Sequence, residues 1–458
     1  MDIYVRDFGV MPNTNTVQTA VIQAAIDACE KSGGGTVHFE AGTYISGTVY
    51  LRSNTYLHIP YMCTIKGSDS FSDYNSPDAW PQNTPIPAER ANGKHLIVGL
   101  EIENSGIYGG GSIDGNGSFF GFKNEEGFSR PSQMVYLCES KNLRIKDLEL
   151  KNAPYWTCFV YGCEDVILSG LHITNNPDIP CCDGIDVDCS KRVIISDCII
   201  NTEDDCITLR GNNSLLGSLK DRSKCLEDVT VTNCQLCTNG CNAFRIGVGN
   251  NPIRNCTISN VVIRNSSKGV CLESRYVFND DGDPGTKIEN ISFNNICMEC
   301  VCPIYISSHC LGITDDIAPD IRNISFSNLT ITSKEGIIVQ SNENAIVENI
   351  SFNNVVFNLE NSEKLKFLEK FLADKVYTDK EAPIVIDKYG YSEWDYATPP
   401  AAFTVANVKK FGMNNVNITI DGELPIDAGM HLYNTTHSLN NVTAEKGGAE
   451  AVLFEVRG

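Results

Sequence analysis

The sequence predicts an all-β fold: a single-stranded right-handed parallel β-helix, or solenoid, with an N-terminal capping helix. Three observations predict it. A motif repeats along the chain, apolar and polar residues alternate with period two inside each copy, and one amphipathic helical segment precedes the first copy. Strands this short cannot bury an apolar face alone, whereas stacked coils bury it jointly.

The repeated unit is a strand, a turn and a second strand, as in KNLRIKDLELKNA (141–153), EDVILSGLHITNN (164–176) and RNISFSNLTITS (322–333). Its alternation and its β-branched residues are typical of strands with one buried face. Successive copies lie 23 to 36 residues apart, which is one coil plus loops of varying length. The equivalent inward positions are Leu143, Val166, Val193, Val229, Cys256, Ile291, Ile324 and Ile350.

Asparagine, serine, aspartate and glycine fill the corners between the strands. Asparagine tolerates the left-handed backbone conformation and hydrogen-bonds to its own main chain, so it suits a tight bend. The Asn-x-Ser/Thr sequences at Asn290, Asn323, Asn328 and Asn349 are therefore interpreted as turns before they are considered glycosylation sites.

We expect one domain over residues 1–458, with a cap at about 1–35. The segment TVQTAVIQAAIDACEKSGGG has the period of an amphipathic helix that ends at Gly33 to Gly35. The residues expected on or near its buried face are Val21, Ala24, Ala25, Ile26 and Cys29.

The repeat is interrupted at about 360–398, where EKLKFLEKFLADKVY (363–377) has helical spacing. We expect an inserted, partly helical segment there. It either covers the solenoid or its cleft, or is a plain surface excursion.

Net charge excludes several classes of partner. The chain has 57 acidic and 36 basic residues, a net charge of −21, and no stretch rich in lysine and arginine, so we expect neither nucleic acid nor membrane as a partner. The N-terminal residues do not resemble a signal peptide, and no apolar run is long enough to span a bilayer. We expect a cytoplasmic protein, and the sequence leaves a homo-oligomer open.

The sequence has 20 cysteines, which in a reducing compartment act as small buried hydrophobic residues. Two groups have spacing that partly resembles metal ligands, but a single CxxC without a second pair is weak evidence for zinc. We therefore expect no metal and no cofactor. The groups are Cys297, Cys300, Cys302 and Cys310, and Cys234, Cys237 and Cys241.

Three aspartates are the candidate catalytic residues. Asp183 lies in CCDGIDVD, and Asp204 and Asp205 lie in NTEDDCITLRG. The pair begins 21 residues after Asp183, about one coil, so the two segments should stack at equivalent points. Glycoside hydrolysis needs one carboxylic acid for the leaving oxygen and an opposed carboxylate for water. The alternative is that adjacent aspartates are solvated corner residues.

The chain resembles glycoside hydrolase family 28, the polygalacturonase family of pectin-degrading β-helix enzymes. The motifs that carry the resemblance follow the family's order: DFGV, QTAVIQAAIDAC, GGGTV, AGTY, LRSNTYLHI, YGGGSIDGNG, NAPYWT, CCDGIDVD and EDDCITLRG. The resemblance implies that Asp204 is the general acid, that Asp183 and Asp205 hold and deprotonate the water, and that the anomeric centre is inverted.

The chain also departs from the family pattern. The family's Asn and Thr before the first Asp are Cys181 and Cys182 here. The family's Gly-His-Gly segment corresponds roughly to CNAFRIGVG, where Cys241 or Asn242 takes the place of the histidine. Arg245 in the same segment is a candidate for the cleft.

The family's Arg-Ile-Lys motif, which resembles a grip for a sugar carboxylate, aligns with Cys271, Leu272 and Glu273. This change predicts a neutral or atypical sugar, because a buried contact between like charges is costly.

Three more residues are candidates for substrate contacts, each with a plainer alternative. Arg210 and Arg275 either face the cleft and bind a charged sugar in another orientation, or are solvated residues at strand ends. Trp156 is either a platform for a sugar ring or part of the core.

We expect a hydrolase that removes the ends of plant cell-wall (pectin-like) oligosaccharides by an inverting, exo-acting mechanism. A polysaccharide lyase is one alternative, since pectate lyases share the β-helix. A non-catalytic carbohydrate-binding β-helix is another.

Overall fold

The computed structural model describes residues 1–121, 129–211, 219–274, 285–308, 319–341, 345–361, 375–377, 385–387, 401–426 and 428–457. The chain divides into two compact units. The first unit comprises Met1–Thr208 and Asn213–Cys234, and the second comprises Leu209–Asn212 and Gln235–Gly458. The single domain expected from the repeat stays a prediction.

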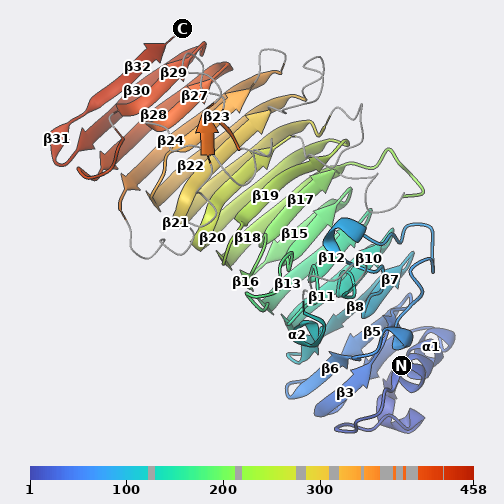
Figure 1. Cartoon of the computed structure of the whole chain (residues 1–458). Coiled ribbons are helices and arrows are strands. Elements are labelled where there is room, and N and C mark those ends of the chain that lie inside the picture. The colour runs from blue at the N-terminus through green and yellow to red at the C-terminus, as the bar shows by residue number, and fades with distance from the viewer. Residues whose placement is uncertain are drawn as a thin grey trace. The chain divides into compact units, whose positions relative to one another are not determined.

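The first unit is built of short strands joined by turns and by a few longer loops (Figure 1). Its helices are η1 Val5–Phe8, α1 Thr19–Lys31, η2 Phe71–Asp73, η3 Pro87–Glu89 and α2 Gly117–Phe120. Its strands are β1 Asp2–Tyr4, β2 Gly35–His38, β3 Gly42–Ser46, β4 Val49–Tyr50, β5 Thr55–His58, β6 Cys63–Gly67, β7 Ile97–Leu100, β8 Glu103–Tyr108, β9 Ser112–Asp114, β10 Val135–Cys138, β11 Lys141–Lys151, β12 Cys158–Tyr161, β13 Glu164–Thr174, β14 Ile185–Asp188, β15 Lys191–Ser196 and β16 Ile199–Thr202.

The second unit has longer strands, because corners inside a strand continue the ladder instead of breaking it. Two strands have residues in both units, β17 Ile207–Gly211 and β18 Leu226–Thr238. The others are β19 Asn242–Gly249, β20 Ile253–Glu273, β21 Ile288–Ser308, β22 Ile321–Ser333, β23 Ile337–Ser341, β24 Val347–Leu359, β25 Lys375–Tyr377, β26 Val385–Asp387, β27 Ala401–Ala406, β28 Val408–Ile420, β29 Ala428–Tyr433, β30 His437–Lys446, β31 Ala449–Glu450 and β32 Val452–Arg457.

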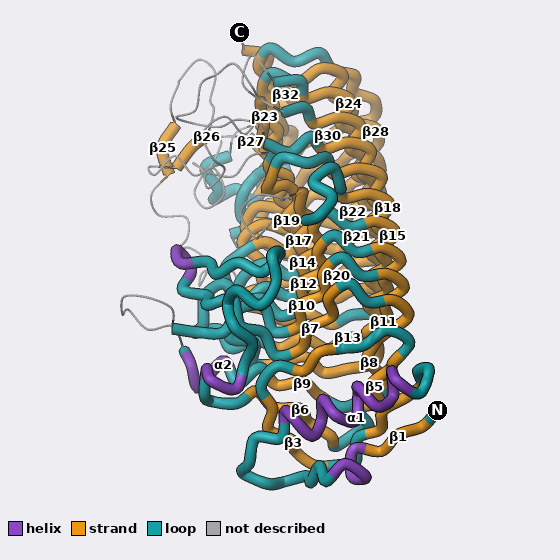
Figure 2. The backbone as a smooth tube through the Cα atoms, turned by 90° about the vertical axis from the view of Figure 1, so that its right-hand side faces the viewer, coloured by secondary structure: helices purple, strands orange, loops and turns teal. Residues whose placement is uncertain are grey.

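The fold class is a right-handed parallel β-helix with an N-terminal helix, as the sequence predicts. Strands of successive coils pair in parallel, for example β10 with β12 and β12 with β14. Figure 2 shows these strands in orange, with loops of the first unit and α2 projecting from one side. Valine, isoleucine, leucine and phenylalanine at alternate positions fill the interior, as a half-buried strand requires.

The inward column predicted from the repeat is confirmed within each unit. In the first, Leu143 pairs with Val166, Val166 with Val193, and Val193 with Val229. In the second, the register runs through Cys256, Ile291, Ile324 and Ile350. The pairs are in register because each coil carries its apolar side chain at the same point of the strand.

Asparagines with positive φ form the corners of the coils. Asn290, Asn323 and Asn349 have φ values of 58°, 57° and 57°. Their side chains bond from coil to coil: Nδ2 of Asn323 donates to Oδ1 of Asn290 (2.9 Å), and Nδ2 of Asn349 donates to Oδ1 of Asn323 (2.8 Å). The turn interpretation of these asparagines is confirmed, since the amide both accepts the left-handed bend and bonds the next corner.

The N-terminal helix is observed as α1, close to its predicted span, and it packs against strands β1, β2, β4 and β5 (Figure 1). Its buried residues are Ile22, Ala25, Ile26 and Cys29. The predicted face is wrong at two positions, because Val21 is partly exposed and Ala24 is exposed. The buried residues lie three, four and seven positions after Ile22, which is the spacing of one face of a helix.

Most of the segment predicted as an insertion, about 360–398, lies outside the described residues. Its described parts, β25 and β26, form an antiparallel pair. The helical period of 363–377 therefore does not extend to Lys375–Tyr377. Among the residues that the structure describes, no helix is both long and apolar enough to cross a membrane.

The cysteines of the described ranges are free thiols, and most of them are buried. Cys297 is exposed, whereas Cys300 and Cys302 are buried in the same strand. Side chains on the two faces of β21 cannot converge on one ion. The interpretation as small core residues agrees with the placement of Cys300 and Cys302 and is wrong for Cys297.

Replacement of Asn323 by alanine should lower the free energy of unfolding by about 2 kcal/mol, because a left-handed residue acquires strain and two corner hydrogen bonds are lost. Urea unfolding measures the change. Asn323→Gly should cost less, because glycine removes only the hydrogen bonds. Thr330→Ala, on the exposed face of the same strand, is the control. Equal losses for the alanine and glycine variants would contradict the role of backbone strain.

Candidate active site

Three successive loops of the first unit carry the predicted residues at equivalent positions. Trp156 precedes β12, Asp183 precedes β14, and Asp204 and Asp205 precede β17. In this ladder the main-chain N–H of a residue donates to the carbonyl of the residue that precedes its paired residue. Cys158, for example, pairs with Ile185, and its N–H donates to the carbonyl of Gly184 (3.0 Å).

The two aspartate loops are joined by main-chain hydrogen bonds. Gly184 N–H donates to Asp205 O (2.8 Å), and Ile185 N–H donates to Cys206 O (2.9 Å). An amide in this ladder bonds to the residue that precedes its paired residue. Gly184 therefore pairs with Cys206, and Asp183 lies beside Asp205. Backbones of neighbouring strands lie about 4.8 Å apart. The stacking predicted from the 21-residue spacing is therefore present in the first unit.

Gly184 allows this close approach. A Cβ atom at Gly184 would lie 2.4 Å from the carbonyl oxygen of Cys206 and 2.7 Å from the side chain of Ile200. Any other residue would push the two coils apart at the point where the aspartates meet. Steric crowding therefore explains why glycine follows Asp183 in the sequence.

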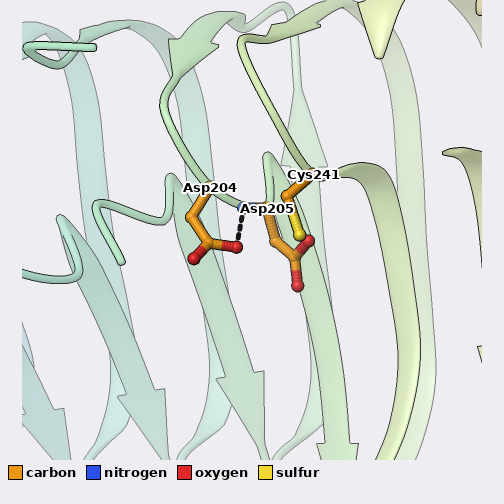
Figure 3. Close-up of side chains that lie close together, drawn as sticks. All are labelled: Asp204, Asp205 and Cys241. Carbon is orange, nitrogen blue, oxygen red and sulfur yellow. Dashed lines mark hydrogen bonds between the residues drawn. The ribbon is translucent and has the colours of Figure 1, made fainter. Parts of the chain in front are cut away.

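The adjacent aspartates are held by short local contacts. The main-chain N–H of Asp205 donates to Oδ1 of Asp204 (2.9 Å; Figure 3). The hydroxyl of Thr202 donates to the carbonyl of Asp204 (2.6 Å). Carboxylate oxygens of Asp204 and Asp205 lie within 4.8 Å of each other. The backbone therefore fixes both carboxylates side by side.

Burial differs within the aspartate group. Asp183 is 5% exposed and Asp205 is 7% exposed, whereas Asp204 is half-buried. A carboxyl that protonates a leaving group must reach the glycosidic oxygen, and Asp204 is the member of the group with the most open side chain.

Several acidic side chains act on the thiol of Cys181. Burial raises the pKa of its thiol well above the ordinary value, and the negative charges of Glu89, Asp204 and Asp183 raise it further. Charges act this way only at short range. Glu203 also reaches the group, since its Oε2 accepts the main-chain N–H of Cys181 (3.1 Å). A thiol with a raised pKa stays neutral, so Cys181 adds no charge to the site.

Two of these acids, Glu89 and Glu203, were not among the residues predicted from sequence. Glu89 ends η3 in the long loop between β6 and β7, and its carboxylate accepts a hydrogen bond from the hydroxyl of Tyr155. The pKa of Tyr155 is raised by burial first, and the charges of Glu89 and Asp183 also raise it. Glu89 and Asp183 thus act on the same two side chains, Tyr155 and Cys181.

Arg130 links this loop to the coils. Its side chain is fully buried, and its guanidinium lies 4.9 Å from the centre of the Tyr155 ring. Nη2 and Nε donate to the carbonyl of Glu89 (2.8 and 3.1 Å), and Nη1 donates to the carbonyls of Pro154 (3.2 Å) and Pro180. Arg130 therefore joins three chain segments, at Glu89, Pro154 and Pro180, and the last of them is the loop that carries Asp183.

Sequence patterns offered little signal for these residues. Glu89 and Pro180 are 41 and 50 positions from Arg130, and the loop that carries Glu89 is outside the repeat. The one available hint is the arginine of SRPSQMVYL (129–137), a cation directly before a strand in which Val135 and Leu137 are fully buried.

Trp156 lies in an aromatic cluster of the first unit. It is 4% exposed, stacks on Tyr155 (4.9 Å between ring centres) and meets Phe159 edge to face (5.5 Å). This placement favours the core alternative over a platform for a sugar ring, because a stacking platform needs an open face.

In the second unit, Arg245 and Glu273 form a buried ion pair. Arg245 Nη2 lies 3.3 Å from Glu273 Oε2, and the two side chains are 1% and 3% exposed. Gly247 makes room for this arrangement, since a Cβ there would lie 3.0 Å from Nη1 of Arg245. This ion pair corrects the reason given for a neutral sugar at Glu273. The charge of Glu273 was expected to repel a sugar acid, but Arg245 compensates that charge.

The other predicted residues of the second unit are also buried. Asn242 is 1% exposed, and its Nδ2 donates to the sulfur of Cys241 (3.2 Å). Arg210 is 8% exposed. Cys271 is fully buried and packs with Cys302 and Tyr305 rather than facing solvent. Arg275 lies outside the described residues. Substrate contacts by Arg210, Asn242, Arg245, Glu273 and Arg275 stay predictions.

Comparison with known proteins agrees with the fold and the motifs. The family model described as "Glycosyl hydrolases family 28" matches residues 37–370. The polygalacturonase QRT2 of Arabidopsis thaliana is 23% identical over 378 residues, which are 73% of this chain and 82% of that protein. The endo-xylogalacturonan hydrolase A of Aspergillus tubingensis is 24% identical over 337 residues, 71% of this chain and 75% of that protein.

A solved structure, the family 28 exopolygalacturonase of Yersinia enterocolitica, has the same fold. It superimposes with a TM-score of 0.67 at 17% identity and covers 97% of this chain and 78% of its own. Since the family match spans most of the chain, this protein belongs to glycosyl hydrolase family 28 and is a glycoside hydrolase.

Proposed function

We propose that this glycoside hydrolase cleaves pectin-like oligosaccharides of plant cell walls from their ends, with inversion, and that it accepts a neutral or atypical sugar rather than galacturonate. The observation that carries the proposal is the register of the first unit, in which Asp183 lies beside Asp205, and the carboxylate of Asp204 lies next to that of Asp205. Hydrolysis of a glycosidic bond requires such a group of carboxyls.

The differences in burial support separate roles for the three aspartates. Asp204, the most exposed, is the general acid that protonates the leaving oxygen. Asp183 and Asp205, nearly buried and stacked on adjacent coils, hold the water and take up its proton as it attacks the anomeric carbon from the opposite face. Water attack from that side gives a product of inverted configuration.

The local excess of negative charge supports a neutral sugar. Besides the three aspartates, two further acids of the first unit lie in or bond to the loops that precede β12, β14 and β17: Glu89 accepts a hydrogen bond from the hydroxyl of Tyr155, and Glu203 accepts one from the main-chain N–H of Cys181. Arg130 is fully buried, with its guanidinium bound to main-chain carbonyls. A sugar carboxylate placed among these acids would be repelled, whereas sugar hydroxyls can donate hydrogen bonds to them.

The loop between β6 and β7 supports action at chain ends. Through Glu89 and Arg130 it is bonded to the coils that carry Tyr155 and Asp183. A loop fixed beside the aspartates can close one end of a substrate groove, and a closed groove accepts a terminal sugar but excludes a continuous chain.

We also propose that the protein acts in the cytoplasm. The free thiols of the described residues support a reducing compartment. The oligosaccharide is the partner that the family and the acids support, and the oligomeric state stays a prediction.

Asp204→Asn should lower kcat on a cleaved oligosaccharide by about 10²- to 10⁴-fold, the usual contribution of a general acid. KM should change little, because the amide keeps the shape of the carboxyl. Steady-state kinetics measures the effect, and NMR of the first product of the parent protein should show the inverted anomer.

Asp178→Asn is the matched control, because Asp178 is an exposed aspartate of the loop that carries Asp183. It should leave kcat unchanged. Full activity of Asp204→Asn, or a first product that retains the configuration of the substrate, would refute the assigned mechanism.

Glu89→Gln should relax the selection against acidic sugars. Removal of one charge beside Asp183 should raise kcat/KM for a uronic-acid oligosaccharide about tenfold relative to its neutral analogue. The measurement is the ratio of the two kcat/KM values. Glu103→Gln, on the exposed end of β8, should leave that ratio unchanged. An unaltered ratio for Glu89→Gln would show that Glu89 does not select the sugar.

A further inference from the structure

Four side chains form an aromatic column on the outer face of the first strands. Tyr4, His38, His58 and Tyr108 occupy consecutive positions in β1, β2, β5 and β8, because Tyr4 pairs with His38, His38 with His58, and His58 with Tyr108. The catalytic aspartates lie in other loops of the unit, and the proposed function makes no use of this column.

The two histidines face each other through the same ring atom. Nδ1 of His38 lies 3.1 Å from Nδ1 of His58, and the rings meet edge to face with 5.2 Å between their centres. Two imidazole nitrogens at this separation either share a proton or bind one metal ion.

Asp2 determines which nitrogen of His38 carries the proton. Its Oδ1 lies 2.9 Å from Nε2 of His38. Because a carboxylate only accepts, Nε2 carries the hydrogen, and the lone pair of Nδ1 points at His58. A carboxylate on the far nitrogen of a histidine is the usual outer support of a metal ligand.

We propose that Nδ1 of His38 and Nδ1 of His58 bind a divalent transition metal ion of the kind that prefers imidazole, such as Zn²⁺, Ni²⁺ or Cu²⁺, with Asp2 as the outer support. Metal–nitrogen bonds of about 2.0–2.1 Å place two nitrogens about 3.3 Å apart in a tetrahedral site and about 2.9 Å apart at a right angle. The observed 3.1 Å lies between these values. Water completes the coordination.

The rings are held in place before any ion binds. Tyr4 stacks on His38 (5.0 Å between ring centres), and Tyr108 lies against His58 (5.1 Å). Gly109 leaves space for His58, since a Cβ at Gly109 would lie 2.6 Å from Cδ2 of that ring. The two ligands are therefore brought together before any ion binds.

Binding exchanges one proton position. Without metal, Nδ1–H of His58 donates to Nδ1 of His38. With metal, both Nδ1 lone pairs coordinate the ion, and the proton of His58 moves through solvent to Nε2. The neutral ligands keep their total number of protons, and the ion's charge is opposed by Asp2.

Charged groups lie on the strands next to the pair. The Met1 ammonium lies near Asp2, Arg6 pairs with Glu40 beside Tyr4, and Lys146 pairs in register with Tyr108.

Calorimetric titration of the chelator-treated full chain with ZnCl₂, and separately with NiCl₂, tests the site. The parent should bind one ion per chain, and the ion should raise its melting temperature. His58→Gln and His38→Gln should each lose this saturable binding, and Asp2→Asn should weaken it about 10- to 100-fold. Glycan turnover should be unchanged in His58→Gln, which separates this site from the proposed function.

Matched controls are His172→Gln, an exposed histidine of β13, and Asp7→Asn, an exposed aspartate near the N-terminus. Both should bind the ion as the parent does. Circular dichroism and the metal-free melting temperature show whether each variant is folded. Unchanged affinity in folded His38→Gln and His58→Gln, or an equal loss in His172→Gln, would overturn the proposal.

Discussion

In-register parallel pairing is the constraint on which both units depend. Each residue of a coil lies beside its equivalent on the next coil, at the spacing of one β-ladder. A feature that recurs once per coil therefore becomes a continuous column. Leucine and valine columns form the interior, asparagine columns form the corners, and two loops with aspartates form the proposed reaction centre. The same rule that builds the core thus brings Asp183 beside Asp205.

The backbone, rather than long side chains, sets the geometry of the aspartates. Gly184 permits two coils to touch, Asp205 N–H fixes the Asp204 carboxylate, and Thr202 holds the carbonyl of that residue. Aspartate has a short side chain, so its carboxylate follows its Cα closely. A reaction that needs carboxyls at fixed places benefits from this rigidity, because little motion remains to be ordered in the transition state.

The sequence predicted what is periodic. The inward column through Val166 and Val193, the turn role of Asn323 and the stacking of Asp183 on Asp205 all follow from position within the repeat, and the structure contains them. What it could not predict is aperiodic. Glu89 reaches Tyr155 from a loop outside the repeat. The conformation of a loop determines which coil residue it contacts, and the spacing of residues in the sequence does not reveal that conformation.

The loop between β6 and β7 has a consequence for how this enzyme could diversify. It is bonded to the coils at many points, among them the guanidinium of Arg130 and the hydroxyls of Tyr155 and Tyr136, while the ladder beneath it has its own main-chain bonds. Under the proposed function, the loop selects the glycan and the ladder carries the aspartates, so the two tasks belong to different parts of the polypeptide. Mutations of loop residues that do not contact the coils would then change the glycan that is accepted and leave the aspartates in place.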